Sequence, residues 1–271
     1  AFFPNYTALI LISVYLIGIL VAILSALLLK STIFQGDPVP FVLELPAYRI
    51  PQPRSVFLHI WEKAKDFLQR AFSIILLASM IIWFLQSFDL HLNLVKDSAD
   101  SILASIGSVI AVIFTPLGFG KWQPVAASLS GFSAKEAIVT TMGVLANVAG
   151  DTEDPAVVAH GVATWFPSAA AGFSFLLFNL LDSPCLAAIA TMAKELNDRK
   201  WFWFAILFQN VFAYVVTFMV YQISGVATGA LTFGASTVVA ILLLAVVLYL
   251  LFRKDPYKGK AMSVKRSVAE A

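Results

Sequence analysis

Long uncharged runs dominate this sequence and decide what it can fold into. A helix needs roughly 20 mostly apolar residues to cross the hydrocarbon core of a bilayer. Runs near that length cover about residues 5–29, 71–88, 101–118, 122–148, 167–193, 201–223 and 228–252. Hydrophobic residues make up 60% of the 271 positions and charged residues 13%, which is more apolar surface than a soluble domain can bury. The sequence therefore predicts an all-α, polytopic transmembrane helical bundle of about seven spans.

The charged residues between these runs show a bias of sign. Basic residues follow the first run, separate the fifth from the sixth, and follow the last: Arg49, Arg54, Lys63, Lys65, Arg70; Lys194, Arg199, Lys200; Arg253, Lys254, Lys258, Lys260, Lys265 and Arg266. The loops at 89–100 and 151–154 are mainly acidic. Because cytoplasmic loops next to spans collect Lys and Arg, we expect the basic clusters inside and the acidic loops outside.

Four regions follow from this pattern, of which residues 1–29 hold the first run and residues 71–252 hold the other six. Between them, residues 30–70 predict a cytoplasmic insertion in which prolines give way to an amphipathic helix from about 57 to 71. That helix lies either on the inner leaflet or against a cytosolic partner domain. Residues 253–271 predict a basic cytoplasmic tail attracted to anionic membrane lipid. The first residues lack an initiator Met and a basic flank, which indicates a piece of a longer protein.

A polar stripe marks the fourth run. On a helix that starts near Ser133, one face would carry Ser133, Glu136, Thr140, Gly143 and Asn147. A charged side chain at membrane depth costs at least about 2.5 kcal/mol, so it normally faces protein or water. Glu136 is therefore either half of a structural pair or part of an ion route. We expect Lys135 to neutralise a buried carboxylate or to cap another element. Residues 101–148 make either two full crossings or a re-entrant hairpin.

The fifth run contains a helix breaker. Pro184 cannot donate a backbone hydrogen bond, so we expect a break there and a new half-helix with Ser183 as its N-cap and Pro184 in its first position. Broken helices at membrane depth often mark the binding sites of transporters. Cys185 would lie in the first turn, where the helix dipole favours the thiolate that binds a metal. The plainer interpretation is a buried free Cys beside a kink.

Several segments, in the same order along the chain, resemble the family of ferrous iron transport protein B. They are Phe41-Val42-Leu43-Glu44-Leu45-Pro46-Ala47-Tyr48-Arg49-Ile50-Pro51, His59-Ile60-Trp61-Glu62-Lys63-Ala64, Pro116-Leu117-Gly118-Phe119-Gly120, Gly131-Phe132-Ser133-Ala134-Lys135-Glu136, Thr140-Thr141-Met142-Gly143-Val144-Leu145, Phe178-Asn179-Leu180-Leu181 with Pro184-Cys185, and Lys200-Trp201. Together these segments are specific, although no single one is.

The resemblance implies Fe²⁺ transport across the bacterial cytoplasmic (inner) membrane, with broken or re-entrant gate helices. It makes residues 1–29 the end of a first permease half and residues 71–252 a second half. It also implies two partners outside this sequence: the remainder of the first permease half and an N-terminal GTP-binding domain. Our candidate residues for the Fe²⁺ path are Cys185, Asp182 and Glu136. Pro184-Cys185 falls on the family's Pro-Cys pair, but at Asp182 and Ser183 relatives often carry an aromatic residue or another Cys.

Three functions stay open from the residues alone. The chain transports Fe²⁺, or it transports an organic solute such as a nucleoside through a similar gate, or it is a non-transporting membrane scaffold. We expect no enzymatic activity and no GTP site, because no GxxxxGK[ST] motif occurs in the sequence. No nucleic-acid partner is expected, and homo-oligomer formation is left open.

Overall fold

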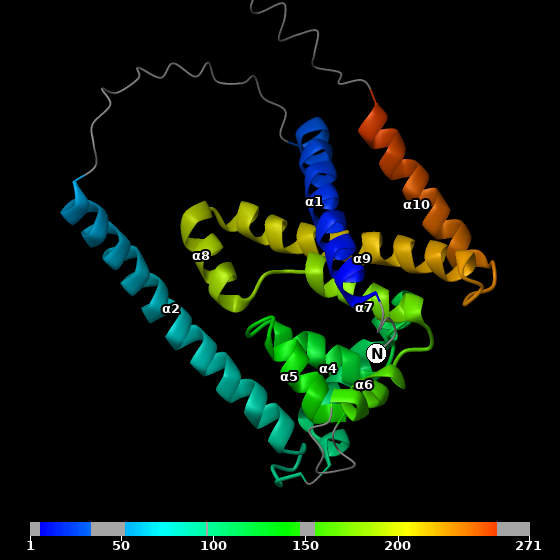
Figure 1. Ribbon diagram of the computed structural model, residues 1–271, viewed down its shortest axis with the longest axis horizontal. Helices are drawn as coiled ribbons and strands as arrows, with labels where there is room; N and C mark the ends of the chain where they lie inside the picture. The colour runs from blue at the N-terminus through cyan, green and yellow to red at the C-terminus, as the bar shows by residue number, and fades with distance from the viewer. Residues whose placement is uncertain (1–5, 34–51, 96, 147–154, 254–271) are drawn as a thin grey trace, which may run out of the picture.

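The fold is all-helical in the parts of the chain that the computed structural model describes, which are residues 6–33, 52–95, 97–146 and 155–253 (Figure 1). Its α-helices are α1 (Thr7–Thr32), α2 (Pro53–Ser87), α3 (Ile102–Phe114), α4 (Trp122–Gly131), α5 (Ala137–Ala146), α6 (Pro155–Ala163), α7 (Ala169–Leu181), α8 (Leu186–Leu196), α9 (Arg199–Ala227) and α10 (Ala235–Phe252). Two short 3₁₀ turns, η1 (Ser98–Asp100) and η2 (Thr115–Leu117), flank α3. The predicted all-α class is confirmed.

Several of these helices are long and apolar enough to cross a membrane. Within the described ranges there are four such stretches, namely α1, α7 and α8 taken together over Ala169–Leu196, α9 and α10. They correspond to the predicted runs at 5–29, 167–193, 201–223 and 228–252. A fifth arises if α3 with η2 and α4 count as one bent span. The protein is therefore polytopic, and its described residues contain four or five candidate spans by length and composition, where we expected seven.

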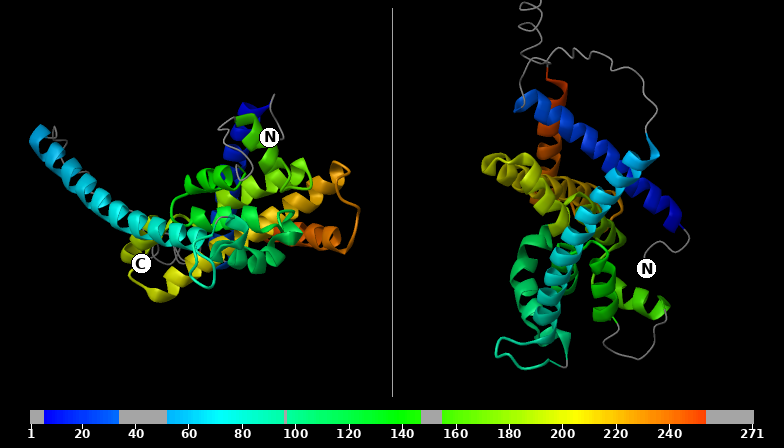
Figure 2. Two further views of the ribbon diagram at one scale, coloured as in Figure 1. Left: turned by 90° about the horizontal axis from the view of Figure 1, so that it is seen from below. Right: turned by 90° about the vertical axis from the view of Figure 1, so that its left-hand side faces the viewer.

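Helix α2 joins two segments that we predicted to be separate. The amphipathic helix at 57–71 and the span at 71–88 form one 35-residue helix. No Gly or Pro occurs between residues 54 and 87, so nothing in the sequence interrupts the helix. Its N-terminal half extends away from the other helices (Figures 1 and 2). The insertion at 34–51, the acidic loop at 147–154 and the tail at 254–271 lie outside the described residues.

Short helices replace full crossings in the region after α2. The chain turns by 100° between η2 and α4, and Gly118 at this turn has a φ of +90°. Helices α4 and α5 have 10 residues each, which is about 15 Å or half of a hydrocarbon core. The single span predicted at 122–148 is therefore wrong, because the helix stops at Gly131 and starts again at Ala137. This geometry favours folded-back helices over two full crossings.

Aromatic packing attaches the bend to α7. Phe119 is completely buried, and its ring centroid lies 5.2 Å from that of Phe114, 5.4 Å from Phe175 and 5.8 Å from Phe178. A second apolar cluster joins α7 to α1, α9 and α10 through Val21, Leu177, Val216, Met219 and Ala240. Helix α7 thus packs against both clusters, which hold its C-terminal end in place, while Leu176 and Leu180 remain exposed.

Candidate functional site

Two helix breaks meet in the fold. One is the turn at 132–136 between α4 and α5, and the other is the segment at 182–185 between α7 and α8. A backbone hydrogen bond joins them, since the Leu186 N–H donates to the Phe132 carbonyl at 2.8 Å. Backbone groups released by a break need partners when they are buried. Here each break provides a hydrogen-bond partner for a backbone group at the other break.

Lys135 forms the centre of this junction. Its ammonium donates to the carbonyl of Asn179 at 2.6 Å and forms an ion pair with the carboxylate of Asp182. The Asp182 side chain is only 6% exposed. Asn179 lies in the last turn of α7, where carbonyls lack helical partners and a cation is favourable. The prediction that Lys135 neutralises a buried carboxylate or caps another element is confirmed, and it does both.

Two amides of α9 hold the second break from its other side. Gln209 Nε2 donates to the Asp182 carbonyl at 3.1 Å, and Asn210 Nδ2 donates to Ser183 Oγ at 2.5 Å. We did not predict either residue as part of the site. The sequence did contain a signal for them, because two adjacent amides interrupt an otherwise apolar run from 201 to 213.

The turn between α4 and α5 is held by close packing and a hydroxyl pair. A Cβ added to Gly131 would lie 2.6 Å from Ile138 Cγ1, so only glycine lets α5 fold back this closely onto α4. Ser130 Oγ and Thr141 Oγ1 are buried and lie 2.9 Å apart, within hydrogen-bond distance. The turn that carries Lys135 is thereby fixed on both sides.

The polar stripe predicted for this region is only partly helical. The helix starts at Ala137, so Ser133 and Glu136 lie in the turn, and Ser133 is buried. Within α5, Thr140 is exposed, while Ile138 and Leu145 are buried. Asn147 lies outside the described residues. Tertiary contacts therefore hold residues 132–136 in a turn, although the spacing of the polar residues predicted a helix there.

Cys185 lies at the second break but not where we predicted it. Helix α8 begins at Leu186, and Cys185 is its N-cap residue with extended backbone. The expectation of Ser183 as N-cap and Pro184 as the first helical residue is wrong, because the Ser183 side chain bonds Asn210 instead. The Cys185 thiol is partly exposed. Cys185 directly precedes Leu186, whose N–H bonds the Phe132 carbonyl, and this places it at the junction.

Glu136 sits next to Lys135 in the first break, and its side chain is exposed. Among the described residues, no three His, Cys, Asp or Glu side chains group as they would to hold a metal ion. The structure therefore brings Asp182 and Cys185 to one junction, with Glu136 on its exposed side, but does not close them into one cage. Asn179 Oδ1 is buried there and has no hydrogen-bond partner, so the junction contains an unused oxygen acceptor.

Comparison with known proteins identifies two family models along the chain. Residues 11–63 match the model described as "Ferrous iron transport protein B C terminus", and residues 68–199 match the Gate model, described as "Nucleoside recognition". Both helix breaks of the junction lie within the second match. No solved structure matches this chain.

Curated relatives cover most of the chain. It is 36% identical to the Fe(2+) transporter FeoB of Staphylococcus aureus (strain MSSA476), over 82% of this chain and 32% of the relative. It is 30% identical to the Fe(2+) transporter FeoB of Escherichia coli (strain K12), over 94% of this chain and 39% of the relative. A fusion protein of Porphyromonas gingivalis, "Fe(2+) transport protein A/Fe(2+) transporter FeoB", is 32% identical over 82% of this chain and 31% of the relative. The chain thus spans about a third of the length of these relatives. It belongs to the family of ferrous iron transport protein B, to whose C-terminal membrane region its helices correspond.

Proposed function

We propose that this chain is the permease portion of a transporter that moves Fe²⁺ across the bacterial cytoplasmic membrane, and that the ion passes the junction of the two helix breaks. One observation carries the proposal: the buried carboxylate of Asp182 lies in the break between α7 and α8, at the point where this break meets the one between α4 and α5. The names of the relatives, which are Fe(2+) transporters, support the choice of ion. They also favour transport over the scaffold and organic-solute alternatives.

Lys135 acts in this proposal as a built-in competitor for the carboxylate. The ammonium neutralises Asp182 while no ion is present, which makes the buried charge tolerable. An arriving Fe²⁺ carries twice the charge of the ammonium, so it can displace Lys135 from the carboxylate. The Lys135 side chain is 34% exposed, and it therefore has a route toward water when it leaves. After the ion moves on, Lys135 returns to Asp182.

The ligands at the junction suit transient binding of Fe²⁺. Asp182 offers a carboxylate, Cys185 offers sulfur, and Asn179 offers the buried amide oxygen that lacks a partner. A mixed oxygen and sulfur set favours a first-row transition metal over Mg²⁺ or Ca²⁺. Glu136, exposed at the adjoining turn, would attract the cation before it reaches Asp182. An open set of ligands fits a path, because an ion must leave a transport site as easily as it enters.

Further parts of the transporter lie outside this chain in the proposal. The relatives are about three times as long, and we infer that a GTP-binding domain and the rest of a first permease half belong to the complete protein. Residues 1–29 would end that first half, 30–70 form the cytoplasmic insertion, 71–252 form the second half and 253–271 form a basic tail. We assign no GTP-binding or enzymatic role to this chain. A second copy of the protein is a further candidate partner.

Uptake of radiolabelled Fe²⁺ by intact cells tests the proposal. The cells lack their own ferrous uptake system and express the full-length protein with Asp182→Asn, Cys185→Ser or Glu136→Gln, with membrane amounts matched by immunoblot. We expect Asp182→Asn to lower uptake by at least about tenfold, which corresponds to about 1.4 kcal/mol. We expect Cys185→Ser to lower uptake and to weaken the preference for Fe²⁺ over Mg²⁺.

Two matched controls separate the junction from general effects. Asp198→Asn removes a carboxylate that only caps α9, and Glu195→Gln removes an exposed carboxylate on α8; both should retain normal uptake. Undiminished Fe²⁺ uptake by Asp182→Asn and Cys185→Ser would refute the proposed path. Uptake of a labelled nucleoside in place of Fe²⁺ by the unmodified protein would refute the proposed substrate.

A further inference from the structure

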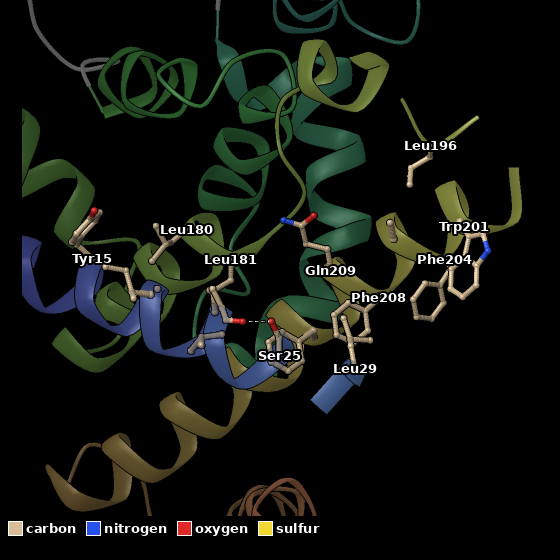
Figure 3. Close-up of a pocket in the computed structure, with 16 residues that line it drawn as sticks. Tyr15, Ser25, Leu29, Leu180, Leu181, Leu196, Trp201, Phe204, Phe208 and Gln209 are labelled. Atoms are coloured by element: carbon tan, nitrogen blue, oxygen red, sulfur yellow. Dashed lines mark hydrogen bonds between the residues drawn. The ribbon is translucent and has the colours of Figure 1, made fainter. Parts of the chain in front are cut away.

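A long apolar groove lies between α1 and α9, and Gln209, which bonds the Asp182 carbonyl, is part of its wall. It encloses a cavity of about 800 Å³ and has Leu180 and Leu181 of α7 in its wall. Figure 3 shows Tyr15 at one end and Trp201 at the other, with Leu29 beside Phe208 on the Trp201 side. Cavities of about 300–1,000 Å³ are typical of ligand sites. The volume is therefore large enough for a sizeable apolar ligand.

Small residues on both helices create this groove. Gly18, Ala22 and Ser25 follow one side of α1, and Ala205 faces the cavity from α9. A Cβ added to Gly18 would come within 3.0 Å of Leu180, so the wall formed by α7 already reaches α1 at this point. The groove is thus open because glycine, alanine and serine occupy positions that a larger side chain would fill.

Two polar side chains in the groove, Ser25 and Gln209, already donate to carbonyls of the protein. Ser25 Oγ donates to the Ala22 carbonyl at 2.9 Å, as Figure 3 shows. Gln209 Nε2 donates to the Asp182 carbonyl at 3.1 Å. A polar ligand group buried here would find few hydrogen-bond partners to offset the cost of losing water. The interior of the groove therefore selects a hydrocarbon chain over a polar solute.

Positive charge gathers at one end only. Lys30 follows the groove residue Leu29, while Lys194, Arg199 and Lys200 flank Leu196 and Trp201, and all four cations are exposed. They outnumber the two carboxylates nearby, Glu195 and Asp198, and the latter already accepts from the Lys200 N–H at 2.8 Å. The lining itself contains no charged residue, and none is adjacent in sequence to Tyr15, Gly18 or Ile19 at the other end. The charge pattern therefore complements a ligand with an anionic head and an apolar tail.

We propose that this groove binds one anionic phospholipid of the inner leaflet, with an acyl chain between α1 and α9 and its phosphate at the cationic end. Helix α9 lines the groove from Trp201 to Phe212, a rise of about 16 Å. One leaflet of the hydrocarbon core has a similar depth of about 15 Å. Basic pockets between helices on the cytoplasmic side bind anionic headgroups, and Trp201 would lie at headgroup level. The proposal does not depend on which ion the junction transports.

Native mass spectrometry of the purified chain with added dioleoyl phosphatidylglycerol or dioleoyl phosphatidylcholine tests it. We expect the anionic lipid to bind at least about tenfold more tightly, or about 1.4 kcal/mol. Ala205→Phe should fill the groove and weaken both lipids, whereas Ala245→Phe on the exposed face of α10 should weaken neither. The triple variant Lys30→Gln/Arg199→Gln/Lys200→Gln should remove only the preference for the anionic lipid. Lys63→Gln/Lys65→Gln on α2 is its matched control.

Three results would overturn the proposal. These are equal affinity for the two lipids, unchanged binding by Ala205→Phe, and a triple variant that keeps the anionic preference. Helical circular dichroism of each variant shows that it is folded, and Lys30→Arg/Arg199→Lys/Lys200→Arg should restore the preference. The same measurement on a full-length protein that contains this chain should again find the anionic lipid. Its absence there would mean that a protein segment fills the groove, and would also overturn the proposal.

Discussion

Replacing Lys135 by methionine isolates what the ion pair contributes to the stability of the junction. Methionine keeps the unbranched stem but leaves Asp182 charged, 6% exposed and unpaired, and the Asn179 carbonyl loses its donor. Removing one partner of a buried pair typically costs about 3–5 kcal/mol. Water reaches part of this pair, since Lys135 is 34% exposed. We therefore expect the free energy of unfolding to fall by about 3 kcal/mol, which is a large share of a typical total.

A double-mutant cycle checks that the loss comes from the uncompensated carboxylate. Asp182→Asn alone leaves an ammonium that still donates to Asn179 and reaches water, so we expect a loss of about 1 kcal/mol. The variant with both substitutions contains no unpaired charge, and its loss should be about 2 kcal/mol smaller than the sum of the two single losses.

Unfolding of the purified chain in mixed micelles, titrated with sodium dodecyl sulfate and followed by circular dichroism, measures these losses. Lys121→Met is the matched control, because that ammonium is exposed and donates only to the Thr164 carbonyl, at 2.8 Å. It should cost less than about 1 kcal/mol. A loss below about 1 kcal/mol for Lys135→Met, or additive losses in the cycle, would refute the view that Lys135 compensates a buried charge.

Two further predictions concern the bend and the acidic loop. Gly118→Ala should lower the unfolding free energy by about 2–4 kcal/mol, since φ is +90° and the new Cβ would lie 2.5 Å from the buried Tyr221 ring; in the same titration Gly143→Ala, with open space around it, should cost nothing. The hydrogen bond from the Asn93 N–H lowers the pKa of Asp89 below its ordinary value of 3.8, so the stabilisation of this loop is present above that pH and is lost as the pH falls through the lowered pKa. Hydrogen exchange of residues 88–95, corrected for intrinsic rates, should therefore speed up on acidification, and Asp89→Ala should exchange fast at every pH; protection that does not change with pH would contradict this.

Much of the architecture was predictable from the sequence because membrane spans depend on local composition. Four of the predicted runs correspond to candidate spans, and the break at Pro184 was expected from the missing N–H of proline. The role of Lys135 was also predictable in kind, since a cation at membrane depth needs a carboxylate or a carbonyl. Its actual partners, Asp182 and Asn179, lie more than 40 residues away in the sequence.

The errors share one physical cause. The run at 122–148 looks continuous in hydropathy, but Gly131 allows α5 to fold back against α4, and this contact is not visible in local composition. The residue type of Ser183 is typical of an N-cap, yet its hydroxyl accepts a hydrogen bond from Asn210 of α9. In both places a partner from elsewhere in the fold overrides the local preference.

The sequence by itself determined that this protein lies in a lipid bilayer, that it is helical, and to which family it belongs. It also determined the chemistry available at Lys135, Asp182 and Cys185. These properties follow from composition and residue type, because every backbone group in a bilayer must be satisfied and only a helix does so locally. The tertiary structure alone decided that the two helix breaks meet, that amides from α9 hold one of them, and that α1 and α9 leave a groove between them. Those features depend on contacts between distant segments, which no local pattern records.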